Sequence, residues 1–221
     1  MNHKQKIDEA RRCFLTDVRV EKRADGEPES RTITGYAVKF GERSVPIWGS
    51  FIEVINRGAF DKADMSDVIM NYGHDDNQIL ARSKSGTLSI NVDEIGVRFS
   101  FDAPNTTLGN DMLEMVSRGD VNQCSFAFTV SEERWTWRTE ENDLDYDLRE
   151  VDSVSKVYDF ALVVHPAYQS TEAHVRAYQE FRSEQTAQSD PEPEKKTEYQ
   201  PTVEDERIRM RARHIQMKTN L

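Results

Sequence analysis

Ser125 is the first residue of this chain whose surroundings favour chemistry. It lies in V-N-Q-C-S-F-A-F-T-V, residues 121–130, a pattern typical of a half-buried strand. Alternation places Cys124 and the two phenylalanines on one face, and Ser125 with small residues on the other. A hydroxyl between small neighbours is open to a molecule outside the sheet. Ser125 is therefore a candidate nucleophile, and an ordinary strand serine is the alternative.

His74 is the candidate base. A serine attacks a carbonyl group when a base, usually histidine, removes its proton and a third group orients that base. His74 follows the predicted strand Val68–Tyr72 and precedes two aspartates, so it stands at a strand-to-loop edge from which a side chain can reach a substrate. The alternative is a surface histidine in a polar turn.

Asp159 is the candidate third member, because it interrupts the apolar run V-Y-D-F-A-L-V-V. A buried carboxylate without a partner costs several kcal/mol, so Asp159 needs a hydrogen-bond donor. A histidine N–H would serve, and an arginine or backbone amides are the alternative. His165 is a rival third member. In one continuous strand it would lie about 20 Å from Asp159, so only one of the two can contact the Ser–His pair.

Two further residues are considered for the same site. Cys124 is a rival nucleophile, but alternation places it beside phenyl rings, which favours a buried and inert thiol. Arg82, in A-R-S-K-S-G, could position a water or the backbone near an oxyanion, or be a surface arginine. The sequence has no glycine-rich phosphate loop, paired-cysteine motif or H-E-x-x-H, so we expect neither a cofactor nor a metal.

The elements that must position these residues are mostly short strands. Alternation and turn signals predict strands at 13–22, 31–40, 51–55, 68–72, 87–92, 97–103, 121–130 and 156–164. A helix is predicted at 106–117, capped by Thr106 or Thr107 and ended by Gly119, and a last helix starts near Ser170. Many strands and few helices predict an α+β, mainly β fold: a small closed β-barrel ringed by a few helices.

The chain divides into a core region and charged flanks. Residues 1–12 are charged and loose, and residues 13–182 form the single expected domain. Within it, residues 131–152 hold nine acidic and three basic residues, which indicates an inserted hairpin with an acidic tip. Residues 183–221 are rich in Glu, Lys, Gln, Ser and Pro, and predict a charged, largely disordered tail with a basic cluster at 207–213.

Composition excludes several classes of protein. The net charge of −11 argues against nucleic-acid binding, because phosphates would be repelled. No run of about 18 apolar residues predicts a membrane span, and the N-terminus lacks the apolar core of a signal peptide. Two cysteines far apart fit a reducing compartment, so a cytoplasmic protein is expected.

Several motifs occur together in a recognisable order. They are I-T-G-Y-A-V-K-F-G, E-V-I-N-R-G-A-F, N-Y-G-H-D, S-G-T-L-x-I-x-V-D-E-I-G-V, L-E-M-V-S-R-G-D-V-N-Q-C-S-F-A-F and Y-D-F-A-L-V-V-H-P-A-Y. Over roughly residues 30–175, this set resembles the prohead (capsid maturation) serine proteases of tailed bacteriophages. Each motif alone is weak evidence for this family, and the six motifs in this order are more specific evidence.

The resemblance implies a fold similar to herpesvirus assemblins and a serine endopeptidase inside the viral procapsid, in the host cytoplasm. Its partners would be the major capsid protein and its scaffolding segment, which such proteases cleave, together with themselves. His74 matches the family's base, Ser125 its nucleophile, and Asp159 its acid, with aspartate here where glutamate is common. Assemblins use a second histidine as the third member of the triad, so His165 stays an alternative to Asp159 here. Assemblins also act as dimers, so a homodimer of this chain is possible under the resemblance.

A different class of function also fits the sequence. The chain could be a catalytically inactive capsid-assembly or scaffolding factor that keeps the fold and binds capsid protein through its charged tails.

Overall fold

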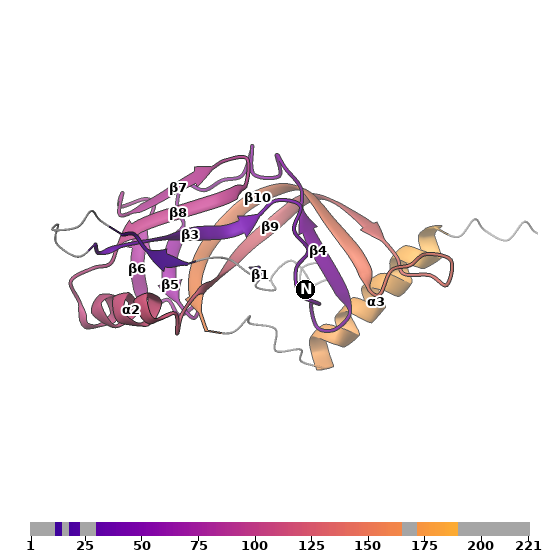
Figure 1. Ribbon diagram of the computed structural model, residues 1–221. Coiled ribbons are helices and arrows are strands. Elements are labelled where there is room, and N and C mark those ends of the chain that lie inside the picture. The colour runs from indigo at the N-terminus through magenta and orange to yellow at the C-terminus, as the bar shows by residue number, and fades with distance from the viewer. Residues whose placement is uncertain (1–11, 15–17, 23–29, 165–171, 190–221) are drawn as a thin grey trace, which may run out of the picture. The chain divides into compact units, whose positions relative to one another are not determined.

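The computed structural model describes residues 12–14, 18–22, 30–164 and 172–189 (Figure 1). The chain divides into two compact units, Met1–Phe181 and Arg182–Leu221. The first unit contains every strand described below, helix α2 (Thr107–Arg118) and the beginning of helix α3 (Glu172–Ser189). The second unit contains the end of α3, which extends further along the chain than the predicted last helix.

The described strands form two sheets. The first has six strands in the order β1-β9-β10-β5-β6, with β4 also paired to β10. The second has four strands in the order β2-β3-β8-β7. Their bounds are β1 Arg12–Phe14, β2 Arg19–Val20, β3 Thr32–Lys39, β4 Phe51–Ile55, β5 Ile69–Tyr72, β6 Ile79–Arg82, β7 Leu88–Val92, β8 Gly96–Asp102, β9 Gln123–Thr136 and β10 Asp147–Val163.

The predicted closed barrel is wrong, although the mainly β composition agrees with the prediction. Among the described strands, β1 and β6 end the first sheet and β2 and β7 end the second, and neither sheet closes on itself. A barrel requires the first and last strands of a sheet to pair in a consistent register. Alternation along each strand shows which face is apolar, but it does not show which edges meet.

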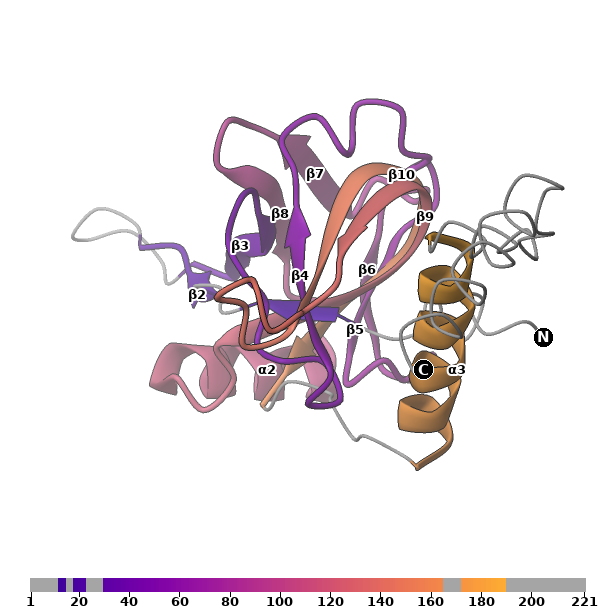
Figure 2. The ribbon, with the colours of Figure 1, turned by 90° about the vertical axis from the view of Figure 1, so that its right-hand side faces the viewer.

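β9 and β10 form a long two-stranded ribbon at the centre of the first sheet (Figure 1). The two strands are antiparallel and remain paired from Leu148 with Thr136 to Val163 with Gln123. The register shifts at several points between Val151 and Asp159. Such bulges bend a ribbon and raise its twist. β10 pairs with β5 through Asp159–Leu162 in one half of the ribbon. In the other half, called the distal half here, it pairs with β4 through Asp147–Val151 (Figure 2).

The main hydrophobic core lies under the half of the ribbon that carries β5. Phenylalanines from β8, β9 and β10 are buried there and contact one another, as Phe99 with Phe160 and Phe126 with Phe128. Helix α2 adds Met112 and Val116 to this core. Thr106 caps the helix, since its hydroxyl accepts a hydrogen bond from the Gly109 amide, and Gly119 ends it at φ 80° as predicted.

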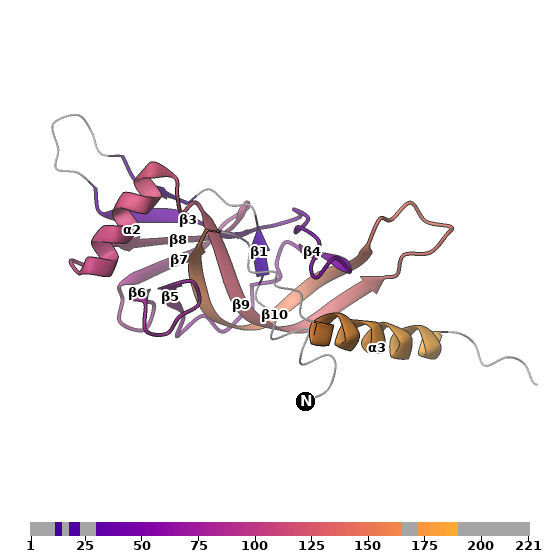
Figure 3. The same ribbon diagram turned by 90° about the horizontal axis from the view of Figure 1, so that it is seen from below.

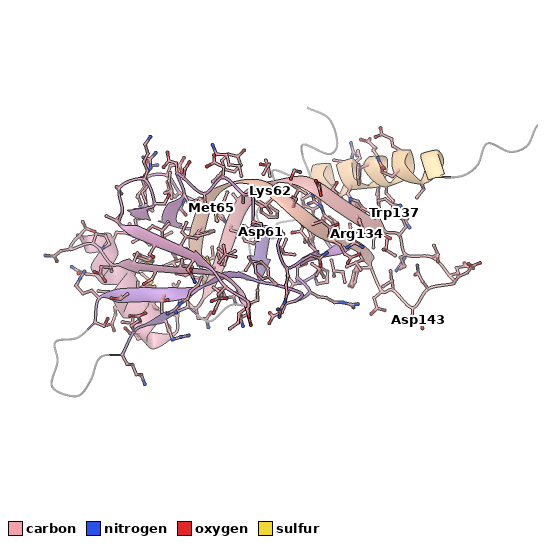
Figure 4. The ribbon with its side chains drawn as sticks, turned by 90° about the horizontal axis from the view of Figure 1, so that it is seen from above. Asp61, Lys62, Met65, Arg134, Trp137 and Asp143 are labelled. Carbon is pink, nitrogen blue, oxygen red and sulfur yellow. The ribbon has the colours of Figure 1, made fainter. Side chains whose placement is uncertain are left out.

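A second core, which the sequence pattern did not reveal, lies at the distal half of the ribbon. The predicted acidic hairpin of residues 131–152 falls in this half. Trp135 and Trp137 stack with their ring centroids 5.1 Å apart, and Trp135 also contacts Phe51 of β4 and Phe181 of α3. Figure 4 shows Trp137 toward α3 and Asp143 at the tip of the connection. The tip is acidic and exposed, while the base of the hairpin packs against β4 and α3.

Buried charges sit beside this second core. The Arg149 guanidinium donates to Glu53 Oε2 at 2.9 Å and also pairs with Glu133. Arg149 and Glu53 are both fully buried. A buried cation between two carboxylates offsets part of the cost of removing all three groups from water. The trio links β4, β9 and β10 in the distal half.

Candidate active site

One face of the first sheet carries the residues singled out from the sequence. Ser125 of β9 lies opposite Ala161 of β10, which lies opposite Asn71 of β5. Asp159 lies opposite Ala127, so it is the diagonal neighbour of Ser125 on the same face. The residues between the polar groups on this face, Ala127 and Ala161, have small side chains, and Ala161 is fully buried.

A β-bulge puts Asp159 on this face. Val157 opposes Phe128 and Asp159 opposes Ala127, so β10 has one more residue than β9 between these pairs. In an unbroken ladder Asp159 would oppose Phe126 and point into the core. Because Tyr158 is the extra residue, the alternation reverses and Val157 and Phe160 both reach the core while Asp159 does not.

His74 reaches the same face through the turn that ends β5. The Gly73 amide donates to the carbonyl of Leu162 at 3.0 Å, which holds the turn against β10. His74 itself has φ 60°, a left-handed conformation that is uncommon outside glycine. Its amide donates to Asn71 Oδ1 at 3.0 Å. Left-handed residues are concentrated at functional sites, where the surrounding structure compensates for their strain.

The His74 ring lies between the serine and the aspartate. Its Nε2 is 2.8 Å from Ser125 Oγ, and its Nδ1 is 2.7 Å from Asp159 Oδ1. A carboxylate can only accept a hydrogen bond, so with an ionised Asp159 the Nδ1–H of His74 donates to it. In a neutral ring, Nε2 then accepts from the Ser125 hydroxyl. This is the arrangement that activates a serine for attack on a carbonyl group.

The site is more enclosed than the sequence predicted. Ser125 is fully buried, whereas we expected a hydroxyl open to the outside. The His74 side chain is 1% exposed and that of Asp159 is 18% exposed. The charge on Asp159 is therefore near solvent, while the Ser–His contact is shielded from it.

The rival residues lie elsewhere. Cys124 points to the opposite face of β9, is buried in the main core, and its thiol lies 3.4 Å from the carbonyl of Ser125. Arg82 pairs with Asp67 through two hydrogen bonds of 2.5 and 2.7 Å. Hydrogen bonding to Arg82 holds the pKa of Asp67 below its usual value. His165 lies outside the described residues.

Asn71 is a site residue that the sequence analysis did not select. It is fully buried, it shares the face of Ser125, and its Oδ1 fixes the His74 amide. Its Nδ2 is buried without a hydrogen-bond partner among the described residues. The signal that could have identified it is the spacing in N-Y-G-H, because an asparagine commonly accepts a bond from an amide two or three residues later.

No group of three or more His, Cys, Asp or Glu side chains in the described part of the chain is placed to hold a metal ion. None of the helices in that part has the length and apolar character needed to cross a membrane.

Comparison with known families agrees with the geometry. Residues 16–187 match the family model described as Caudovirus prohead serine protease. That match covers most of the chain and includes all three residues of the Ser–His–Asp arrangement.

The chain belongs to the prohead serine proteases of tailed phages. Membership in this family indicates a serine protease with a role in capsid maturation, inside the procapsid. Searches among curated proteins and among solved structures gave no match.

Proposed function

We propose that this chain is a serine endopeptidase that cleaves the scaffolding segment of the major capsid protein, and itself, inside the procapsid. The observation that carries the proposal is the position of the His74 ring, with Ser125 Oγ 2.8 Å from one nitrogen and Asp159 Oδ1 2.7 Å from the other. Hydrogen-bond contact on both nitrogens is the geometry that acyl transfer by serine requires.

In the first half of the reaction, Ser125 Oγ attacks the peptide carbonyl while His74 Nε2 takes the hydroxyl proton. Asp159 holds the ring in the tautomer whose Nε2 accepts from the Ser125 hydroxyl, and stabilises the imidazolium that forms. His74 then gives the proton to the leaving amine, and the acyl group stays on Ser125.

In the second half, water replaces the amine. His74 takes a proton from the water as it attacks the acyl carbonyl, and returns that proton to Ser125 Oγ when the acyl group leaves as a carboxylic acid. The aspartate again compensates the imidazolium charge. The reaction needs no metal or cofactor, since the nucleophile, base and orienting acid are all side chains of this chain.

The test is processing of co-expressed capsid protein by Ser125→Ala. We expect uncut capsid protein and an uncut protease, while the wild-type chain shortens both. Ser131→Ala is a matched control, because Ser131 is an exposed serine on the same strand. Terminal sequencing of the products then gives the cleavage sites. Normal processing by Ser125→Ala would refute the proposal.

The cysteine alternative and the inactive-factor alternative make different predictions. A cysteine protease would lose activity in Cys124→Ala and on thiol alkylation, whereas we expect both treatments to leave cleavage in place because Cys124 faces the core. An inactive assembly factor would process nothing in any variant. The position of His74 against Ser125 and Asp159 favours the serine protease over both.

A further inference from the structure

The edge of the nucleophile's strand is occupied by the chain's own N-terminal segment. β1 pairs antiparallel with β9 through three residues, with Arg12 opposite Phe126, Cys13 opposite Ser125 and Phe14 opposite Cys124. Figure 3 shows β1 beside β9. Among the described strands, β1 is the only one paired with this edge, because β10 takes the other edge. The short strand is therefore centred on Ser125.

An extended peptide on this edge has its main chain beside the serine. Neighbouring strands lie about 4.8 Å apart, and opposed Cα atoms in antiparallel strands lie roughly 4.5–5.5 Å apart. A nucleophile needs its target carbonyl at about 3–3.5 Å. A peptide in this position runs alongside the residue whose hydroxyl contacts His74. Ser125 has no exposed surface with β1 in place.

β1 is separable from the rest of the fold. It is paired through three residues, whereas the pairing of β9 with β10 runs almost the full length of both strands. From Val18 onward the chain is held independently. The Val18 amide donates to the carbonyl of Asn122 at 3.3 Å, its side chain is buried in the main core, and β2 then pairs with β3. Short strands with few ladder bonds belong to the least stable parts of a structure.

We propose that the edge of β9 beside Ser125 is the docking edge for extended peptide substrates, and that β1 occupies this edge in cis until a substrate strand replaces it. This proposal rests on the proposed function, because the docked peptide is a substrate only if the chain is a protease. In this mode of binding, a peptide adds a strand to a sheet edge. Main-chain hydrogen bonds between the peptide and the edge strand supply the affinity. β1 demonstrates that an extended backbone fits there.

The principal test is removal of β1. Deletion of residues 1–14 should lower KM for a peptide containing a mapped cleavage site and leave kcat close to wild type, since the variant no longer has to displace its own strand. If β1 holds the edge nine-tenths of the time, KM falls about tenfold. Deletion of residues 1–10, which keeps β1, is the matched control and should leave KM unchanged. An unchanged or higher KM after deletion of 1–14 in a folded protein would overturn the proposal.

A second test does not depend on catalysis. In the variant that combines deletion of 1–14 with Ser125→Ala, a fluorescent synthetic peptide of residues 1–16 should bind, as measured by anisotropy, and a scrambled peptide of the same composition should not. Unlabelled substrate peptide should compete for the same edge. Hydrogen exchange of the fragment containing residues 124–126 should accelerate on deletion of 1–14 and slow again on peptide addition. No binding, with unchanged exchange, would refute the occupancy of the edge by β1.

The two proposals fail in different ways. If Ser125→Ala processes capsid protein normally, the proposed function is wrong, whatever the peptide does. If processing requires Ser125 but deletion of 1–14 changes neither KM nor hydrogen exchange, the catalytic proposal stands and the docking edge is wrong.

Discussion

The direction of the Asp159 side chain is set by an irregularity in its strand. The carboxylate contacts His74 Nδ1 because the bulge at Tyr158 turns it away from the core and toward Ser125. Its side chain is 18% exposed, so its charge does not require a second buried partner. The aspartate side chain is long enough to place Oδ1 2.7 Å from His74 Nδ1.

Replacing that carboxylate should damage catalysis and leave folding intact. We expect Asp159→Asn to lower kcat by about 10³- to 10⁴-fold, because an amide can no longer hold the Nδ1–H tautomer or stabilise the imidazolium. The measurement is cleavage of a mapped peptide, with a thermal melt to establish folding. Asp76→Asn removes an exposed carboxylate two residues after His74, and should retain activity. Equal loss in both variants would contradict the assignment of Asp159.

Asn71 acts on His74 through the backbone. Its Oδ1 accepts the His74 amide proton and so supports the left-handed turn that aims the ring over the sheet. It is buried on the same row as Ala161 and Ser125. Asn71 is thus a positioning residue within the proposed site, since the contact is made with the main chain and not with the ring.

At the scale of elements, the β9–β10 ribbon joins two regions with different cores. One half carries β5 and the Ser–His–Asp arrangement, and the distal half carries β4 and the aromatic cluster around Trp135. The Arg149 trio lies in the distal half, and its members come from three strands. A fully buried cation therefore bridges carboxylates from the two strands beside its own.

Removing that charge should destabilise the fold. We expect Arg149→Met to lower the free energy of unfolding by about 3–5 kcal/mol, because it leaves the fully buried Glu53 carboxylate without its cation. Arg134→Met is the matched control on β9. Its side chain is 61% exposed and pairs with Asp152, and such pairs are worth at most about 1 kcal/mol. Urea titrations of the two variants give the comparison, and similar small losses in both would contradict this account.

At the scale of the whole molecule, the chain divides into two compact units, and the residues of the proposed site belong to the first. The Ser–His–Asp residues and both cores lie within Met1–Phe181. Tyr178 donates to Asp147, and Phe181 packs on Trp135, so the first half of α3 belongs to the first unit. The remainder of α3, from Arg182 to Ser189, belongs to the second unit.

Deleting residues 183–221 should therefore leave peptide cleavage intact. We expect the same deletion to reduce incorporation into procapsids, because we propose that the basic cluster at 207–213 contacts capsid or scaffold protein. The measurements are peptide hydrolysis and the amount of protease in isolated procapsids. Full-length Ser125→Ala is the control, since under the proposed self-cleavage it keeps its tail, and it should be incorporated. Equal incorporation of the deletion variant would contradict a role for the tail in packaging.

Local pattern was enough to predict much of this protein. Alternation predicted β4, the β7–β8 hairpin and the Ser125 strand, and capping chemistry predicted the ends of α2. A carboxylate in an apolar run predicted that Asp159 would have a donor, and His74 was among the donors considered. These inferences succeed because side-chain period, caps and the cost of a buried charge are properties of a few consecutive residues.

Tertiary structure alone decided how the strands meet. The open sheets in place of a barrel, the bulge that turns Asp159 toward Ser125, and β1 on the edge of the Ser125 strand all depend on pairing between distant segments. The second core depends on Trp135 meeting Phe51 and Phe181. Sequence period identifies the face of each strand, but register and edge pairing are set by the packing energy of the assembled sheet.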